Sequence, residues 1–452
     1  MKGTRFLVAG AIVAAAAMAL VGCSSGTPGA GNAATVGTVS TAGTSAAPGS
    51  TIATTASGNI TVWLMQDTLT ADAQTAVVNG FEQQSGVTVD VQIQQWDDIN
   101  TKMTTALATD DPPDVVEIGN TDVPLFAANG GLMDITQYKA DLEGSNTWLT
   151  GLEGPATVDG KLFAAPFYAG TRAVIYNEDM WTAAGITAAP TSYDEFTADL
   201  DKVAAANSAT DFSPLYMPGT YWYNALSFLY DAGGALATQN GTTWAGQLET
   251  AQSQQGLADF KAFQNKYSTE ASRTAPMDTP DPGTVFTTGK TSAIMGNGNA
   301  LKTAQQAAPD MKIGSFPFPS KADPGQNMPN FLGGSDIAIS AKSQNPTAAL
   351  AFLKYITSDD AQINQIGGAS GHVPISNELI DKVTPTLPDN MKSFYVGAKL
   401  SISTPATPGW ATIESDNSVT DFFSSVASGA KTTQQAAADF DQHLNDALNA
   451  NS

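Results

Sequence analysis

The side chains best suited to nucleophilic or metal chemistry are scarce in this sequence. Its one cysteine is Cys23, and its two histidines, His372 and His443, lie far from it and from each other. Neither histidine has a cysteine or a second histidine at the spacing of a metal ligand. Isolated histidines also argue against catalysis of the Ser-His or Cys-His kind. We therefore expect no catalytic residue, no metal ion and no other cofactor.

Acidic side chains are the remaining candidates for such chemistry. Asp278 and Asp281 precede Gly283, but the ligand alternation and the closing glutamate of a calcium loop are missing. We interpret this stretch as a solvated loop. Paired carboxylates that cleave a glycosidic bond stay open as an alternative, because the chain has 43 Asp and Glu residues.

Amide, carboxylate and aromatic side chains recur where strands and loops are expected to meet. An aromatic ring can cover the C–H face of a sugar, while Asp accepts hydrogen bonds from hydroxyls and Asn or Gln both donates and accepts. For Trp63, Phe352 and Phe440 we favour packing in the core. For Trp222 and Trp410, which lie in polar stretches rich in Gly and Pro, we favour a binding role. The candidate ligand-binding residues of this kind are Gln66, Asp67, Trp96, Asn120, Thr121, Trp222, Tyr223, Asn297, Asn299 and Trp410.

The elements that must position the first of these residues alternate in type. Apolar periodicity predicts strands at 60–64, 87–93 and 114–118, and helices at 70–84 and 97–108. Thr70 is the expected N-cap of the first helix. This rhythm predicts a parallel α/β sheet. Ligands of open α/β sheets bind outside the carboxyl ends of the strands, which is where Asp67, Trp96 and Asn120 stand.

The rest of the chain is expected to be more helical. Asn345 is the expected N-cap of a helix that has Pro346 at its first position. Phe440, Leu444 and Leu448 recur every fourth residue, which indicates a helix that packs on the core. The other expected elements are helices at 193–206, 223–229 and 252–267 and strands at 293–296 and 335–340.

The first residues have the layout of a secretory signal peptide. A basic start precedes an apolar run from Phe6 to Val21, and this run is short for a membrane span. The Leu-Val-Gly that comes directly before Cys23 resembles the lipobox of bacterial lipoproteins. This resemblance implies that residues 1–22 are removed and that Cys23 is lipidated. The alternative is an ordinary signal peptide with a chance cysteine.

Residues 24–58 consist almost wholly of Ser, Thr, Gly, Ala, Pro and Val, with no charged or aromatic residue. Such a segment cannot bury enough apolar surface to offset the entropy lost on ordering. We interpret residues 23–58 as the lipidated cysteine and a flexible tether. The folded body is expected to begin at Asn59.

The balance of 20 Lys and Arg against 43 Asp and Glu gives a net charge of −23. A strongly acidic surface repels phosphate backbones, so we expect no nucleic-acid partner. The same charge favours a neutral ligand over an anionic one, although net charge does not fix the field of a local site. The alternative is that the acidity only keeps an exported protein soluble.

From Asn59 to its end, the chain resembles the extracellular solute-binding proteins of carbohydrate ABC transporters, the class that includes maltose-binding protein. The nearest likeness is to actinobacterial lipoproteins that take up N,N′-diacetylchitobiose, on the blocks "QQWDDI", "EIGNT" and "FLGGSD". The blocks that carry the wider resemblance occur in the expected order and are "ITVWLMQD", "FEQQSGVTVDVQIQQWDDI", "PPDVVEIGNT", "GKLFAAPFYAGTRAVIYNEDMWTAAGI", "FLGGSDIAIS" and "NPTAALAFLKYITSDDAQ".

The resemblance implies an α/β fold of two doubly wound lobes, joined by crossing hinge strands, with the ligand cleft between them. We expect the N-terminal lobe to hold residues 59–168 and 334–372, and the C-terminal lobe residues 169–333 and 373–452.

The resemblance also places individual residues. Tyr168 stands at the first crossing, and Gly334 stands at the second, where a missing Cβ lets backbone and ligand approach. Many relatives carry Trp where this chain has Asn299, so an amide replaces a stacking platform, which argues against a maltodextrin-type ligand. We expect Arg172 to form a structural ion pair, and a contact of Arg172 with the ligand stays open as the alternative.

Together these features predict a receptor at the extracellular face of a Gram-positive cell membrane. It is expected to be a lipid-anchored monomer without enzyme activity that delivers a mono- or oligosaccharide to an ABC transporter permease. Two alternatives stay open. One is a secreted lipoprotein enzyme that acts on polysaccharide. The other is a receptor for iron or peptide in the same fold, for which Tyr221 and Tyr223 are the only hint of iron ligands.

Overall fold

The computed structural model describes residues 49–450. Cys23 and the leader therefore lie outside the described residues, as do residues 451–452. Within the described part, no helix combines the length and the apolar character that a membrane crossing needs.

The first sheet begins with three parallel strands, as the sequence predicts. Strand β1 (Asn59–Met65) pairs with β2 (Thr88–Gln94) on one side and with β3 (Val115–Gly119) on the other. Helices α1 (Ala71–Ser85) and α2 (Ile99–Ala108) connect them. Thr70 caps α1 as expected, because its hydroxyl accepts a hydrogen bond from the backbone N–H of Ala73 at 3.2 Å. This arrangement brings the carboxyl ends of the three strands to one edge.

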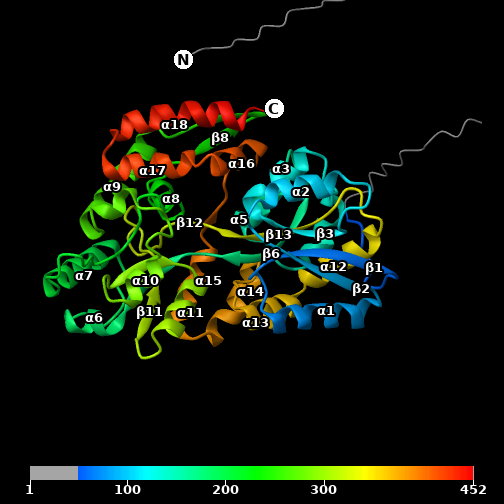
Figure 1. The fold of residues 1–452 in the computed structure, drawn as a ribbon, viewed down its shortest axis with the longest axis horizontal. Coiled ribbons are helices and arrows are strands. Elements are labelled where there is room, and N and C mark those ends of the chain that lie inside the picture. Colours follow the sequence, from blue (N-terminus) through cyan, green and yellow to red (C-terminus); the bar gives the residue numbers. More distant parts are fainter. Residues whose placement is uncertain (1–48, 451–452) are drawn as a thin grey trace, which may run out of the picture. The chain divides into compact units, whose positions relative to one another are not determined.

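Two antiparallel strands complete this sheet, in the order β2-β1-β3-β13-β6. Strands β6 (Ala164–Gly170) and β13 (Gly333–Ile339) run side by side (Figure 1); the chain passes from β6 into the second lobe and returns from it through β13. The sheet is therefore mixed rather than wholly parallel. The reason is that β13 returns from the second lobe against the direction of β3, with no crossover helix over the sheet face.

The second sheet has the order β10-β7-β11, with antiparallel pairing throughout. Its strands are β7 (Ala173–Asn177), β10 (Ala293–Gly296) and β11 (Ile313–Phe316). Only Thr171 and Arg172 separate β6 from β7, and only Leu332 separates β12 (Asn330–Phe331) from β13. The first of these links joins the two sheets directly. The second joins the first sheet to β12, which pairs with β14 (Ser401–Ile402) rather than with the second sheet. We call the two links the crossings between the lobes.

Helices predicted for the second half are present with nearly the expected bounds. They are α7 (Tyr193–Ala206), α8 (Trp222–Asp231), α9 (Ala251–Tyr267), α12 (Pro346–Ile356) and α18 (Thr433–Leu448). The structure adds three helices that the sequence analysis does not predict, which are α6 (Glu178–Ala183), α11 (Gly298–Ala307) and α17 (Ser418–Ser428). The stripe of Phe440, Leu444 and Leu448 is buried, as predicted. Asn345 does not cap α12 with its side chain; its amide nitrogen lies 3.4 Å from the Asp114 carboxylate instead.

Two hydrophobic clusters form the core. The first contains Val62, Phe81 and Ile337 around the five-stranded sheet and continues to Ile175 and Ile294 on the second sheet. The second contains Trp181 and Phe196 and lies among the helices around the three-stranded sheet. The chain thus builds two α/β lobes, each on its own sheet.

Smaller elements complete the fold. They are α3 (Val123–Ala128), α4 (Lys139–Glu143), α5 (Thr150–Ala156), β4 (Thr157–Val158), β5 (Lys161–Leu162), β8 (Ala237–Asn240), β9 (Thr243–Gly246), α10 (Pro282–Thr287), α13 (Gly368–Ser370), α14 (Asn377–Val383), α15 (Asp389–Ala398), β14 (Ser401–Ile402) and α16 (Pro408–Ser415), with the short η1 (Asn120–Asp122), η2 (Thr136–Tyr138), η3 (Ala271–Thr274), η4 (Ala361–Gly367) and η5 (Thr384–Thr386).

The end of the expected tether packs onto the body. Ile52 is 4% exposed and belongs to the first hydrophobic cluster. Its backbone N–H donates to the Asp141 carboxylate at 2.7 Å, and the N–H of Ala56 donates to the carbonyl of Ser85 at 3.2 Å. The sequence analysis missed this contact because it judged residues 24–58 by their average composition, in which the single Ile52 carries little weight. Residues 49–58 are therefore not tether but an edge of the first lobe.

Candidate functional site

Two adjacent cavities open beside the crossings between the lobes. We call the larger one, of about 680 Å³, the tyrosine cavity, because Tyr221 and Tyr223 line it together with residues of α10, β10 and α11. We call the smaller one, of about 320 Å³, the crossing cavity, because residues 168–172 and 333–334 line it. Asn297 and Asn299 line both cavities. The two cavities therefore form one continuous candidate site.

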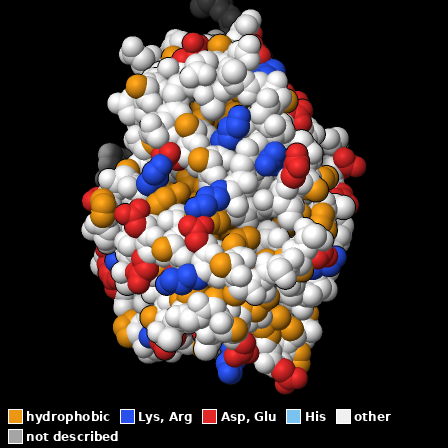
Figure 2. All heavy atoms as spheres, turned by 90° about the vertical axis from the view of Figure 1, so that its left-hand side faces the viewer, with side chains coloured by type: hydrophobic (Ala, Val, Ile, Leu, Met, Phe, Trp, Pro, Cys, Tyr) orange, Lys and Arg blue, Asp and Glu red, His pale blue; other side chains and the backbone are white. Residues whose placement is uncertain are grey.

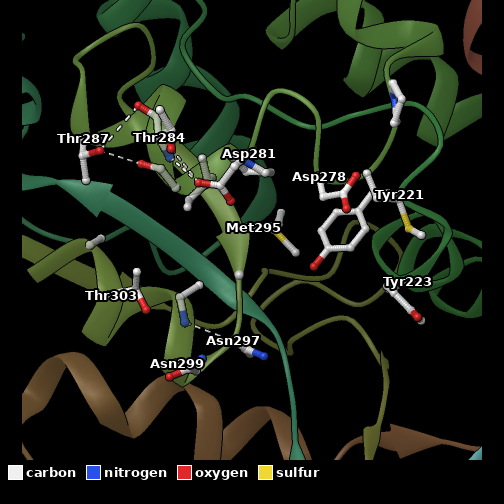
Figure 3. Close-up of a pocket in the computed structure, with 18 of the residues that line it drawn as sticks. Tyr221, Tyr223, Asp278, Asp281, Thr284, Thr287, Met295, Asn297, Asn299 and Thr303 are labelled. Carbon is white, nitrogen blue, oxygen red and sulfur yellow. Dashed lines mark hydrogen bonds between the residues drawn. The ribbon is translucent and has the colours of Figure 1, made fainter. Parts of the chain in front are cut away.

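The tyrosine cavity offers both flat apolar and polar surfaces. In Figure 3, Tyr221 and Asp278 lie at one side, the cap of α10 lies at the other, and Asn297 and Asn299 lie at the lower edge. Asn297 caps α11, because its side-chain oxygen accepts from the N–H of Ala300 at 2.9 Å. The side-chain nitrogen of Asn297 faces away from this bond and is free to donate to a ligand.

Asp281, one of the two aspartates considered above for a calcium loop, is the N-cap of α10. Asp281 accepts hydrogen bonds from the N–H and the hydroxyl of Thr284, at 2.7 and 2.8 Å. Its carboxylate is therefore committed to starting a helix. Across residues 49–450, no three His, Cys, Asp or Glu side chains converge in a way that could hold a metal ion.

Arg172 connects the first crossing to the wall of the tyrosine cavity. Its Nε donates to the Tyr221 hydroxyl at 3.2 Å, and its guanidinium lies 4.1 Å from the centre of the Tyr223 ring. That ring in turn stacks on Phe331 at 5.1 Å. Arg172 has no carboxylate partner among the described residues, so the expected ion pair is wrong. Aromatic faces hold the cation in its place.

Backbone and aromatic side chains pack closely at the crossing cavity. The Tyr168 ring stacks on His372 with 4.0 Å between the ring centres. Burial lowers the pKa of His372, so the imidazole is neutral at pH 7, and its Nε2 donates to the carbonyl of Thr68. Gly334 has a φ of 133°, and a Cβ there would lie 2.2 Å from the carbonyl oxygen of Tyr168. Only glycine fits at this point.

The carboxyl edge of the first sheet faces the same region. Asp67, with a φ of 64°, lines the crossing cavity directly after β1. Gln66 and Trp96 are exposed beyond β1 and β2 but line neither cavity. Trp96 is 44% exposed, and its ring edge lies 3.8 Å from the Cβ position of Gly119. It is the one candidate tryptophan whose ring is accessible.

Trp222 and Trp410 do not offer their rings to a ligand in this conformation. They are 3% and 0% exposed, and their rings pack edge to face at 5.9 Å within the second hydrophobic cluster. We had expected both rings to be exposed, because the residues next to them in the sequence are polar or are Gly and Pro. However, Trp222 begins α8 and Trp410 stands in the first turn of α16, and both helices turn that face inward.

Asn120 is likewise structural rather than accessible. It is 3% exposed, and its side-chain nitrogen donates to the carbonyls of Gly151 and Leu332 at 3.0 and 2.9 Å. Both amide hydrogens are thus used. Asn120 ties the end of β3 to α5 and to the second crossing, so it supports the site without lining it.

Two carboxyl groups face each other where α16 of the second lobe meets η1 of the first. Burial raises the pKa of Glu414 to about 8, and the nearby Asp122 adds to this effect, while a hydrogen bond with the Thr121 side chain opposes it. Burial also raises the pKa of Asp122 to about 6, although Asn100 donates to it at 3.1 Å. Near neutral pH, Glu414 is therefore mostly protonated, and this contact between the lobes escapes full charge repulsion.

This protonation makes stability depend on pH in a known direction. An unfolded Glu414 has a pKa near 4.5, so between pH 4.5 and 8 the folded state binds more protons than the unfolded state. Glu414 therefore costs stability as the pH rises through this window. We therefore compare the free energy of unfolding of Glu414→Gln with that of the wild type. We expect this difference to shift in favour of the variant by about 1 to 3 kcal/mol between pH 5 and pH 8. Urea unfolding of both proteins at the two pH values measures this.

The control for that experiment is Glu270→Gln. The Glu270 side chain is 88% exposed and pairs only with Arg273 at 3.6 Å. Its stability difference from the wild type should stay the same at both pH values. A Glu414→Gln difference that is also constant between pH 5 and 8 would contradict the raised pKa.

Comparison with known proteins gives consistent matches. Residues 39–392 match the family described as bacterial extracellular solute-binding protein. The diacetylchitobiose binding protein DasA of Streptomyces coelicolor is 32% identical over 400 residues, which cover 86% of this chain and 90% of the relative.

Solved structures with the same fold include other binding proteins. The sugar-binding protein MalE from Xanthomonas citri has a TM-score of 0.73 at 20% identity, and the match covers 86% of this chain and 97% of that one. A cyclic α-maltosyl-1,6-maltose binding protein from Arthrobacter globiformis has a TM-score of 0.72 at 20% identity, covering 87% and 99%. At this identity, the likeness concerns the two-lobed fold.

Proposed function

The chain belongs to the family of bacterial extracellular solute-binding proteins, and on that basis we propose that it is the sugar-binding receptor of an ABC transporter. It captures a mono- or oligosaccharide in the cleft between its lobes and delivers it to the permease. The observation that carries this proposal is the 32% identity to a diacetylchitobiose binding protein over most of both chains. The receptor binds and releases its ligand without catalysing a reaction.

The first candidate ligand is N,N′-diacetylchitobiose or a related disaccharide. The tyrosine cavity, at about 680 Å³, falls in the range of about 300 to 1,000 Å³ that is typical of ligand sites. Tyrosine rings suit the C–H faces of sugars, and the amides of Asn297 and Asn299 suit hydroxyl or acetamido groups. This combination supports a neutral, amide-bearing sugar in that cavity.

We propose a ligand-binding set that revises the one expected from sequence. Asn120, Trp222 and Trp410 support the walls, and Tyr221 joins the direct contacts. Trp96 and Gln66 extend the site toward solvent on the first lobe. The proposed contacts are Gln66, Asp67, Trp96, Thr121, Tyr168, Tyr221, Tyr223, Asn297, Asn299 and Gly334.

Delivery requires the lobes to open and close. The two crossings are short and tightly packed, so we propose them as the hinge between the lobes. The N-terminal lobe then holds residues 59–168 and 334–372, and the C-terminal lobe holds residues 169–333 and 373–452. Hinge closure around a ligand is the motion described for periplasmic binding proteins. The ligand must bind the closed state more tightly, since otherwise it would shift no population.

We also propose that the receptor is a lipid-anchored monomer at the extracellular face of a Gram-positive membrane. Cys23 directly follows an apolar leader, and the segment from residue 24 to residue 48 is the tether to the body. We expect Cys23→Ser to move the protein from the membrane fraction to the medium, because the only acylated group is lost. Immunoblots of fractionated cells measure this. Sugar affinity should not change, and retention of the variant on the membrane would contradict the anchor.

Thermal unfolding with a sugar panel tests the function. At about 100 times its dissociation constant, a ligand stabilises the folded state by about 2.7 kcal/mol. We expect N,N′-diacetylchitobiose or a related disaccharide to raise the midpoint, and iron salts or peptides to leave it unchanged. Release of reducing ends from chitin would support the enzyme alternative instead, and a panel without any effect would overturn the proposal.

A further inference from the structure

We propose that the crossing cavity binds an anionic group, such as the carboxylate of an acidic sugar, a sulfate or a phosphate. The proposal deepens the function given above, because it assigns a charged substituent to the ligand of the same cleft. It starts from two positive side chains in this cavity, Arg172 and Lys302.

Nearly all other described Lys and Arg side chains pair with carboxylates. Figure 2 shows this for one face of the second lobe, where blue and red side chains lie next to each other. Within residues 49–450, the exceptions are Lys102, Arg172, Lys261 and Lys302. Lys102 lies over the Trp63 ring at 5.3 Å. Arg172 and Lys302 thus bring two unpaired positive charges to one cavity.

The guanidinium of Arg172 is positioned to receive an anion. Its Nε is used by Tyr221, and one face is covered by Tyr223. Nη1 lies 3.7 Å from the Cβ position of Gly333, where no side chain intervenes. The two Nη groups, which have no protein partner among the described residues, suit the paired oxygens of a carboxylate, sulfate or phosphate.

Lys302 approaches the same space from α11. Its ammonium donates to the carbonyl of Ser370 at 3.3 Å, which leaves two further N–H groups. Its charge also contributes, after burial, to the lowered pKa of His372 on the cavity wall. Among the described residues, Asp67 is the one carboxylate that lines the cavity, so positive side chains outnumber negative ones there.

Uncharged donors add to this positive field. The ten-residue helix α11 begins at the cavity, where Gly298 and Asn299 line the wall, and the N-terminus of a helix favours an anion. Thr171 also lines the cavity; its hydroxyl is buried without a hydrogen-bond partner in the described structure. A buried unpaired hydroxyl is costly, so Thr171 leaves one unsatisfied donor in the wall of the cavity.

The net charge of −23 does not oppose this local preference. Surface charges more than about 10 Å away are largely screened by salt, whereas charges inside a cleft act through a medium of lower dielectric constant. The whole-chain charge predicts a neutral ligand, and the crossing cavity predicts the opposite for the part of the ligand that enters it.

Two disaccharides that differ in charge test the proposal by calorimetry. One is neutral N,N′-diacetylchitobiose, and the other is glucuronic acid linked to N-acetylglucosamine. We expect the acidic sugar to bind about tenfold more tightly, as one charge-assisted hydrogen-bond pair predicts. The preference should fall below about threefold in Lys302→Gln and in Arg172→Gln. It should persist in Lys261→Gln, which removes a half-buried, unpaired lysine outside both cavities.

Sodium sulfate and sodium phosphate, exchanged against sodium chloride at constant ionic strength, test the cavity without a sugar. Either anion should raise the thermal midpoint of the wild type and of Lys261→Gln more than that of Lys302→Gln. Lys302→Gln keeps the test decisive if Arg172→Gln does not fold. Equal affinity for the two disaccharides, or a preference for the neutral one, overturns the anion proposal and leaves the sugar receptor intact. If neither sugar binds, the sugar function fails, and the sulfate and phosphate shifts then decide the anion proposal on their own.

Discussion

Replacing Gly334 by alanine is expected to destabilise the protein by about 3 kcal/mol or more, or to prevent folding. The backbone at Gly334 has a φ of 133°, which an L-residue rarely adopts, and the new Cβ would lie 2.2 Å from the carbonyl oxygen of Tyr168. Tyr168 lies in β6, whose backbone pairs with β13 on both sides of a β-bulge at Ser335 and Asp336. Neither strand can move without breaking the ladder. Urea unfolding measures the loss.

The neighbouring glycine supplies a matched control. A Cβ at Gly333 would meet its nearest atoms at 3.7 Å, which is ordinary contact, and its φ is not positive. Gly333→Ala should therefore change stability by less than about 1 kcal/mol. If Gly334→Ala does not fold, the yield of soluble protein relative to Gly333→Ala gives the same comparison. Equal stability of the two variants would show that the crossings are not packed as described.

Replacing Tyr221 by alanine is expected to weaken sugar binding by about tenfold to a hundredfold, which corresponds to about 1.4 to 2.7 kcal/mol. The Tyr221 ring is half-buried in the wall of the tyrosine cavity, and its hydroxyl accepts from Arg172. The variant loses the apolar face that a sugar would cover and releases the guanidinium beside it. Calorimetry with N,N′-diacetylchitobiose measures the change in affinity.

Two further variants separate the parts of this effect. Tyr221→Phe keeps the ring and should lose less than about threefold in affinity for a neutral sugar, because only the hydroxyl is removed. Tyr138→Ala removes a half-buried tyrosine that packs on the first core and lines neither cavity, so its affinity should match the wild type. Equal losses in Tyr221→Ala and Tyr138→Ala would refute a direct role for Tyr221.

The sequence predicts those parts of the fold that depend on local periodicity. The helix expected at 193–206 has these bounds in the structure, and the first three strands begin and end within one residue of expectation. The direction of β6 and β13 was not predictable in this way, because it depends on where the chain re-enters a sheet after the whole second lobe. The burial of Ile52 was missed for a similar reason, since its partners lie far along the chain.

The candidate site shows the same division. The rule that ligands bind beyond strand ends directed attention to Asp67, which follows β1, and to Asn297, which follows β10, and both residues line a cavity. It could not tell which way a ring points from the start of a helix. Tyr221 lines the cavity while the adjacent Trp222 enters the core. The one signal in the sequence was the position of Tyr221, which stands directly before the helix that begins at Trp222.

The meeting of Arg172 and Lys302 in one cavity was beyond local prediction. They are 130 positions apart in the sequence, and their shared cavity exists only because the first crossing and the start of α11 meet in space. Their lack of carboxylate partners likewise appears only when every ion pair is known. The net charge of the whole chain favoured a neutral ligand. Such a sum does not reveal one cavity in which positive side chains outnumber negative ones.

The most direct test of a sugar receptor is calorimetric titration of the purified protein with N,N′-diacetylchitobiose, repeated with Tyr221→Ala. A dissociation constant of 1 μM corresponds to about −8.2 kcal/mol. We expect a single site of about this affinity, which Tyr221→Ala weakens by at least about tenfold. A folded protein that binds neither this disaccharide nor its acidic counterpart would contradict the proposed role as a receptor for such sugars.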